Sequence, residues 1–239
     1  PILLKGLGCR NVDIAAYTRA KGSEAFVAKD DADFRQILSL LRARKVFRQT
    51  RVLFPTDRGL PASCSVGSVF DLDGLRKRLG VDVKTISYRR MAEEMQRVLE
   101  SKAAETQARE AAAALLQKAH HSFIDAQYVT RSMQYYRALR NLMARTACNA
   151  FTIECFEFCS SRLPERWTIT PCLIHALLRN LECASSCEGD LGSLLAMRML
   201  MSVAARSCHQ GNSDPTSPDT FRINHSATSM KLNGFDQPD

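Results

Sequence analysis

The chain has 239 residues, of which 45% are hydrophobic and 24% charged, and its formal net charge is +8. These proportions are ordinary for a soluble globular protein, and the apolar runs are too short to cross a bilayer, which excludes a membrane-spanning class. Residues 1–5 lack the charged start and long apolar region of a secretory signal. We therefore expect a cytoplasmic protein with no membrane partner.

The basic residues and the cysteines do not indicate a special class of protein. The basic clusters at 42–51 and 76–78 lie at the ends of predicted helices and lack the aromatic interleaving that stacks bases. Solvated helix faces are favoured over a nucleic-acid partner. The nine cysteines, an odd number, fit a reducing compartment better than a disulfide scaffold. Two pairs are spaced four residues apart, unlike a zinc knuckle, so we expect core residues rather than zinc ligands.

Helices and short apolar strands alternate from residue 31 onwards. Apolar residues recur at helical spacing from Phe34 to Leu41 behind an acidic start, which predicts an amphipathic helix. The next predicted elements are a buried strand at 51–54, a Gly/Pro/Ser-rich loop at 55–68, a helix at 72–79 and a strand at 81–86. The first thirty residues show little beyond a short apolar start.

The second half of the chain continues this alternation. Its predicted elements are a helical stretch at 91–118, a helix at 126–147, a strand at 149–153 followed by a loop, helices at 171–180 and 191–205, and a strand at 220–224. Alternating strands and helices without hairpin dipeptides predict a Rossmann-like α/β fold, a parallel sheet flanked by helices. Such sheets bind ligands at the carboxyl ends of their strands.

One turn carries the residues best suited to chemistry. Glu188-Gly189-Asp190 follows a short apolar segment and precedes a helix, and two acids on such a turn can hold a cation or move a proton. The alternative is a capped helix, with Asp190 as the N-cap residue. The wider candidate set is Glu188, Asp190, His209, Asn212, Asp214 and His225. Ligands of these types suit Mn²⁺ or Mg²⁺, and proton acceptors beside a cation would serve the enolisation of a sugar carbonyl.

Four short runs in this region resemble the L-fucose isomerase/L-arabinose isomerase family. They are Thr170-Pro171-Cys172-Leu173, Cys187-Glu188-Gly189-Asp190-Leu191, Gly211-Asn212 and Asn224-His225-Ser226. Segments 34–54 and 72–86 are also similar to that family's second α/β domain. The likeness covers most of the chain from about residue 30, and its specific motifs occupy residues 148–226.

The resemblance implies a metal-dependent aldose–ketose isomerase that uses Mn²⁺ and assembles as a homo-oligomer. It also implies three parts: a tail of an N-terminal domain or linker at 1–29, a central α/β domain at 30–205, and the start of a β-rich C-terminal domain at 206–239. On this basis we expect the chain to correspond to a portion of a family member.

The resemblance also assigns roles to single residues. Glu188 matches a glutamate that binds the cation and acts as the proton-transfer base. Asn212, twenty-four residues later, falls near a second acidic position, and an asparagine cannot act as a base near neutral pH. Asp214 can substitute for it after a small loop shift, and His225 matches the histidine of the arabinose-isomerase branch. The expected metal ligands are thus Glu188, Asn212, Asp214 and His225, and the expected catalytic residues are Glu188 and Asp214.

The predicted function is the isomerisation of a free sugar, such as L-fucose or L-arabinose, through an enediolate. A second hypothesis is a sugar-binding or assembly subunit of the same family that has lost catalysis. It is favoured by Asn212 and by the lack of a counterpart to the family's later histidine. These two features also predict little turnover by the 239-residue chain alone.

Overall fold

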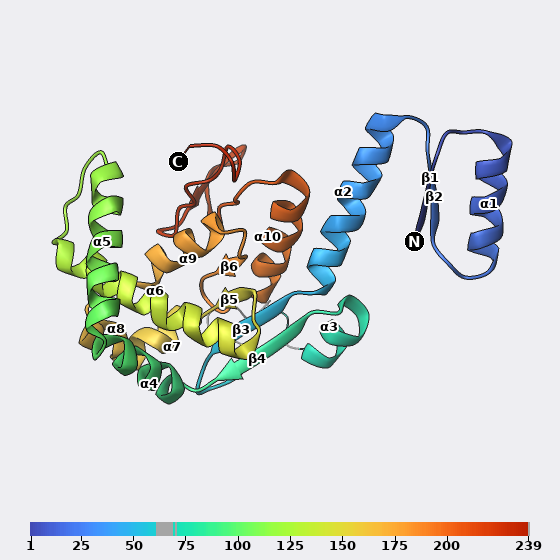
Figure 1. Cartoon of the computed structure of the whole chain (residues 1–239). Helices are drawn as coiled ribbons and strands as arrows, with labels where there is room; N and C mark the ends of the chain where they lie inside the picture. The colour runs from blue at the N-terminus through green and yellow to red at the C-terminus, as the bar shows by residue number, and fades with distance from the viewer. Residues whose placement is uncertain (61–68, 70, 239) are drawn as a thin grey trace.

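The computed structural model describes residues 1–60, 69 and 71–238. Its centre is a four-stranded parallel sheet with the strand order β4-β3-β5-β6 (Figure 1). The strands are β3 (Arg51–Pro55), β4 (Asp82–Ile86), β5 (Ala150–Thr152) and β6 (Ser185–Ser186). The parallel sheet flanked by helices confirms the predicted α/β class.

The pleat of the sheet divides the core between its two faces. Leu53 and Phe151 pack with α4 (Tyr88–Leu99), α6 (Ala126–Thr146) and α9 (Pro171–Asn180). Val52 and Ala150, each one residue earlier, pack on the opposite side with α3 (Leu72–Leu79) and α10 (Leu191–Ala204). All four strand side chains are fully buried, so helices cover both faces, as the apolar strands predict.

A small unit at the N-terminus lies apart from this sheet. It contains β1 (Ile2–Lys5), α1 (Cys9–Ala20) and β2 (Ala25–Ala28), and the two strands pair in parallel. Helix α2 (Asp31–Arg48) connects it to the main body, and the unit projects beyond that helix in Figure 1. Its buried hydrophobic residues are three alanines, Ala15, Ala25 and Ala28. The weak sequence pattern reflects this small core.

Two stretches differ from the prediction. The helical stretch at 91–118 is two helices, α4 and α5 (Lys102–Lys118), because the Ser101 hydroxyl caps a new helix by accepting the Ala104 amide at 3.2 Å. The predicted loop after β5 contains α7 (Cys155–Ser160) and α8 (Leu163–Trp167). The Glu154 carboxylate caps α7 through the Phe156 and Glu157 amides.

The C-terminal region is a hairpin of β7 (Asn212–Ser217) and β8 (Thr220–Asn224). Only β8 was expected as a strand from its composition. The antiparallel register sets Asn212 opposite Asn224. Asn212 at the start of β7 and His225 directly after β8 therefore lie at the same end of the hairpin. Of the loop predicted at 55–68, residues 56–60 are irregular as expected, and 61–68 lie outside the described residues.

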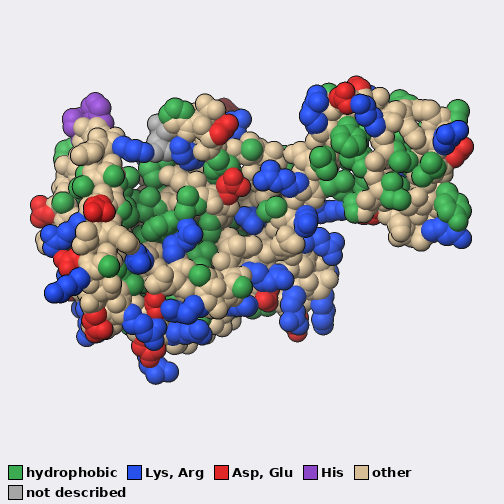
Figure 2. All heavy atoms as spheres, in the orientation of Figure 1, with side chains coloured by type: hydrophobic (Ala, Val, Ile, Leu, Met, Phe, Trp, Pro, Cys, Tyr) green, Lys and Arg blue, Asp and Glu red, His purple; other side chains and the backbone are tan. Residues whose placement is uncertain are grey.

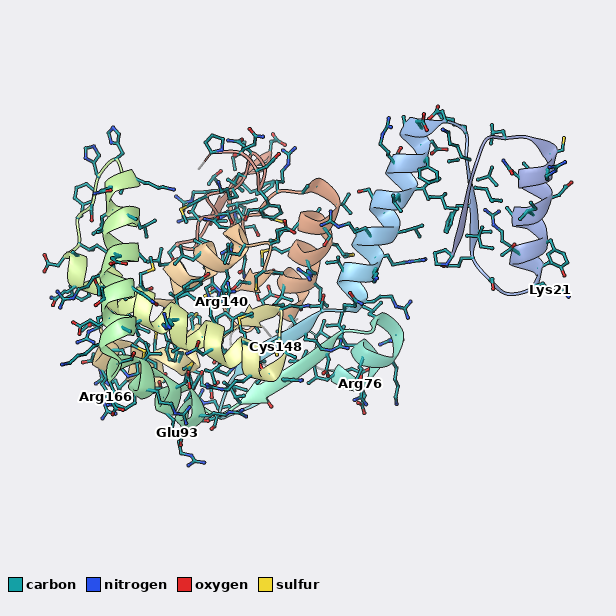
Figure 3. The ribbon with its side chains drawn as sticks, viewed as in Figure 1. Lys21, Arg76, Glu93, Arg140, Cys148 and Arg166 are labelled. Atoms are coloured by element: carbon teal, nitrogen blue, oxygen red, sulfur yellow. The ribbon has the colours of Figure 1, made fainter. Side chains whose placement is uncertain are left out.

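On the face shown in Figure 2, basic side chains gather over the lower part of the main body, with acidic side chains among them. The labelled Arg76, Glu93 and Arg166 extend outward from three different helices in Figure 3, and Lys21 follows the end of α1. Among the described helices, none is both long and apolar enough to cross a membrane.

Candidate functional site

The candidate site lies at the carboxyl edge of the central sheet. Because β3, β5 and β6 run in parallel, the segments after them meet at one edge. These segments place Thr56, Glu154 and Glu188 there. Each of the three comes directly or shortly after its strand, so the sheet topology brings distant parts of the sequence together.

The turn that carries Glu188 is strained. Glu188 has a φ of 64° and Gly189 a φ of 65°, and the left-handed region is unfavourable for a residue with a side chain. The Gly189 amide donates to the Ile153 carbonyl at 3.0 Å, which ties the turn to the end of β5. Asp190 is the N-cap of α10, and its carboxylate accepts the Ser193 amide at 2.9 Å. The capped-helix interpretation of Asp190 is therefore correct.

The hairpin places two further predicted residues beside Glu188. The Asn212 amide nitrogen donates to Glu188 Oε1 at 3.3 Å, and His225 Nε2 lies 3.9 Å from the same oxygen. The side chain of Glu188 is 21% exposed and that of His225 is 7% exposed. Gly211 permits this approach, because a Cβ there would lie 2.2 Å from Ile223 Cγ2. Residues 37 positions apart thus meet at one edge.

The contact at the second ring nitrogen of His225, Nδ1, determines which nitrogen carries the proton. The Ala227 amide donates a hydrogen bond to His225 Nδ1 at 3.1 Å. Because a backbone amide only donates, Nδ1 is the unprotonated nitrogen and the neutral ring carries its proton on Nε2. Burial and the nearby Arg179 guanidinium lower the pKa of His225, while the Glu188 carboxylate opposes this shift. The ring is therefore a neutral Nε2–H donor that faces Glu188.

Two buried residues hold this arrangement, and the sequence analysis did not find them. Arg179 is fully buried and donates to the Ala227 carbonyl at 2.7 Å, which fixes the segment after His225. Gln210 is 6% exposed and accepts the Cys187 amide at 2.8 Å, directly before Glu188. Both form hydrogen bonds with backbone groups that are distant in the sequence. The spacing of residues in the sequence does not indicate such contacts.

The remaining candidates, Asp214 and His209, have different surroundings. Asp214 is on the hairpin, more than half exposed, and its carboxylate pairs with the Arg222 guanidinium at 2.6 Å. Burial lowers the pKa of His209, and the nearby Arg179 and His225 lower it further. His175 is a core residue whose Nδ1 lies 2.7 Å from Ser185 Oγ. The structure brings Glu188, Asn212 and His225 together and leaves Asp214 in a surface ion pair.

A second carboxylate cluster at the same edge was not predicted. Glu157 of α7 is 5% exposed and accepts three hydrogen bonds. The donors are the Thr56 hydroxyl at 2.7 Å, the Asp57 amide at 2.9 Å and the Arg58 amide at 2.8 Å. This carboxylate joins the end of β3 to α7, a contact between residues about one hundred positions apart.

A pair of thiols lies beside the site. A hydrogen bond between Cys155 and Cys187 lowers the pKa of the Cys155 thiol and, together with burial, raises that of Cys187. The cysteines in the described part of the chain are all free thiols.

The donor groups around Glu188 do not fit a divalent cation. The neutral His225 ring presents a proton at Nε2, where a metal ligand needs a lone pair. Asn212 turns its amide nitrogen, not its oxygen, toward Glu188. Over residues 1–60 and 71–238, no group of three or more His, Cys, Asp or Glu side chains is placed to hold a metal. The expected Mn²⁺ site stays a prediction that these donors do not support.

A scan against models of known protein families finds no match, and a search of curated proteins finds no significantly similar sequence. Two hollows of about 670 and 650 Å³ lie beside α5, and neither is lined by Glu188. They are mainly apolar, with Arg140, visible in Figure 3, at the rim of the larger one. The two large hollows are therefore separate from the Glu188 side chain, and the functional argument rests on Glu188, Asn212 and His225.

Proposed function

We propose that the protein is an aldose–ketose isomerase that acts on a free sugar through an enediolate. The observation that carries this proposal is the meeting of Glu188 and His225 at the carboxyl edge of a parallel sheet, 3.9 Å apart. A carboxylate beside a neutral imidazole supplies a base and a hydrogen-bond donor, the two groups that enolisation needs. The resemblance in residues 148–226 supports L-fucose, L-arabinose or a related aldose as the substrate.

In this reaction Glu188 moves the carbon-bound proton. Its carboxylate removes the proton from C2 of the open-chain aldose, and the electron pair of that bond forms the C1–C2 double bond. The same carboxyl group then returns the proton to C1, which yields the ketose. The strained turn holds the carboxylate at the sheet edge, and its 21% exposure leaves part of it accessible.

A catalytically incomplete sugar-binding or assembly subunit is the second candidate. It is favoured by one observation, the ion pair between Asp214 and Arg222, which leaves Asn212 where the resemblance implies an acid. We further propose a cytoplasmic homo-oligomer. The basic clusters lack the aromatic interleaving that stacks bases, which supports a sugar rather than a nucleic acid as the partner.

The test is ketose formation from L-fucose, L-arabinose and related aldoses, with and without Mn²⁺. We expect slow turnover of at least one sugar by the wild-type chain and none above background with Glu188→Gln. Glu182→Gln is the matched control, because Glu182 is also a glutamate with a positive φ, 58°, and it lies outside the site. Saturable sugar binding without turnover in any condition would reject the isomerase and favour the incomplete subunit.

A further inference from the structure

We propose that His225 is a catalytic residue that donates its Nε2 proton in a hydrogen bond to the substrate's carbonyl oxygen, and that enolisation at this site proceeds without a divalent cation. This inference rests on the proposed isomerase function. It differs from the metal-ligand role that the resemblance implies for His225.

The first argument is the hydrogen bond from the Ala227 amide to His225 Nδ1, at 3.1 Å. A histidine that binds a metal through one nitrogen commonly donates the proton of its other nitrogen to an acceptor. Here the other nitrogen faces a donor. Placing a proton on Nδ1, as metal binding through Nε2 requires, would set it against the Ala227 amide proton. The local backbone therefore favours the Nε2–H form.

The second argument is the rigidity of this backbone. Arg179 is fully buried and donates to the carbonyl of Ala227 at 2.7 Å and to the Ser229 hydroxyl at 3.2 Å. It also donates to the Cys208 carbonyl at 3.1 Å. These bonds hold the segment that carries the Ala227 amide, and with it the donor that faces Nδ1 of His225. Arg179 is thus a positioning residue for the ring.

The third argument is the position of Nε2. Its distance of 3.9 Å from Glu188 Oε1 exceeds the 2.7–3.2 Å of an ordinary N–H···O bond. Within the described residues no hydrogen bond to His225 Nε2 is formed. The proton is therefore available to a substrate oxygen that lies beside Glu188. A neutral imidazole donor next to a glutamate base is an arrangement that supports sugar-phosphate isomerisation without a metal.

The step balances without a co-reactant. Glu188 takes the proton from C2, the C–H electron pair forms the C1–C2 double bond, and the carbonyl π pair moves to O1. The hydrogen bond from His225 Nε2 stabilises the charge on O1, which then receives the O2 hydroxyl proton. The O2 electron pair forms the new carbonyl while C1 takes the proton back from Glu188. No electrons leave the substrate, and both side chains return to their starting states.

A structural experiment tests the tautomer directly. In a chain with ¹⁵N-labelled histidine, two-bond ¹H–¹⁵N correlation spectra identify which ring nitrogen of His225 is protonated, with His225→Leu used to assign the signals. We expect an unprotonated Nδ1 and a protonated Nε2. Titration with Mn²⁺ alone, followed by the six-line paramagnetic resonance of the free ion, should show no binding that His225→Leu removes. A protonated Nδ1, or Mn²⁺ binding lost in that variant, overturns the inference.

Kinetics test the role of the donor. Deleting it in His225→Leu should lower turnover by about 10²–10³-fold, while His225→Gln, which keeps an N–H donor, should retain more activity. His121→Gln is the control, an exposed histidine that lies outside the site. Treatment with EDTA should leave wild-type turnover unchanged. Turnover only with Mn²⁺ would overturn the inference and leave the isomerase intact, whereas no turnover in either condition would reject the isomerase and, with it, this role.

Discussion

Two glutamates at the same sheet edge have different surroundings. The Glu157 carboxylate accepts the Thr56 hydroxyl and two backbone amides at 2.7–2.9 Å. Glu188 accepts the Asn212 amide at a longer 3.3 Å and lies 3.9 Å from His225. Glu157 is also the more buried, at 5% exposure against 21% for the Glu188 side chain.

The difference shows how to separate a structural acid from a reactive one. Short hydrogen bonds from backbone amides at a buried site stabilise the fold. They also occupy the acceptor positions of the carboxylate that a proton from the substrate would need. A partly exposed carboxylate on a strained turn, beside a neutral donor, contributes less to stability and is better placed for substrate. We therefore expect Glu157 to matter for folding and Glu188 for chemistry.

The largest expected effect is on activity at Glu188. Glu188→Gln should lower turnover by about 10²–10⁴-fold, because it removes the base, and should change the free energy of unfolding by less than about 1 kcal/mol. Steady-state kinetics and urea unfolding on the same preparation check both values. A large loss of stability would show that Glu188 is a structural acid like Glu157.

The complementary change should act on the fold. Glu157→Gln places an amide group against three donors, so we expect a loss of about 2–4 kcal/mol in the free energy of unfolding. Urea denaturation measures it, with the exposed Glu165→Gln as a control of the same chemistry. A neutral result would contradict the structural role of the cluster.

A buried histidine beneath β6 gives a pH-dependent effect of similar size. Burial lowers the pKa of His175 to about 3, with a contribution from Arg179. The unfolded ring binds a proton below about pH 6.5, whereas the folded ring stays neutral, so the stability is complete above that pH and is lost as the pH falls toward 3. The loss should approach 1.4 kcal/mol per pH unit, or about 2–3 kcal/mol between pH 6.5 and 4.5.

Unfolding measured across this range should show that slope, and His175→Asn should reduce it. If the variant keeps the full slope, another group causes the acid sensitivity and the burial of a neutral His175 is not its source.

The smallest expected effect is on the free energy of unfolding when the backbone strain at Glu188 is relieved. Glycine adopts a φ of 64° without steric cost, so Glu188→Gly should raise the free energy of unfolding by about 1 kcal/mol while abolishing turnover. Glu182→Gly, at a φ of 58°, should stabilise similarly and leave turnover unchanged. Thermal unfolding of both variants checks the expectation. Destabilisation by Glu188→Gly alone would show that the Glu188 side chain supports the fold.

The sequence predicted the elements whose signals are local. The helix at 171–180 was predicted at its observed bounds, since Pro171 opens it and the Thr170 hydroxyl caps it. Helices α7 and α8 were missed because they are short, with six and five residues. The break at Ser101 was hidden by the strong helical propensity on both sides of it.

In the site, too, the sequence indicates local features and does not indicate contacts made by tertiary structure. The resemblance grouped Glu188, Asn212 and His225, and the structure places these three side chains close together. The paired state of Asp214 and the role of Gln210 could not be predicted, since both depend on partners placed by tertiary structure. The tautomer of His225 is the clearest case, because a single backbone amide sets it.

The most direct test of the central claim follows the proton that Glu188 is proposed to move. EDTA-treated protein is incubated with the best aldose substrate in D₂O, and NMR of the ketose locates any deuterium. The account predicts that the wild-type chain and Glu182→Gln form ketose whose C1 carries either the hydrogen from C2 or deuterium exchanged into the Glu188 carboxyl group, and that Glu188→Gln forms no ketose. Ketose that forms only after Mn²⁺ is restored, or that Glu188→Gln also forms, would contradict a metal-independent transfer through the Glu188 carboxylate.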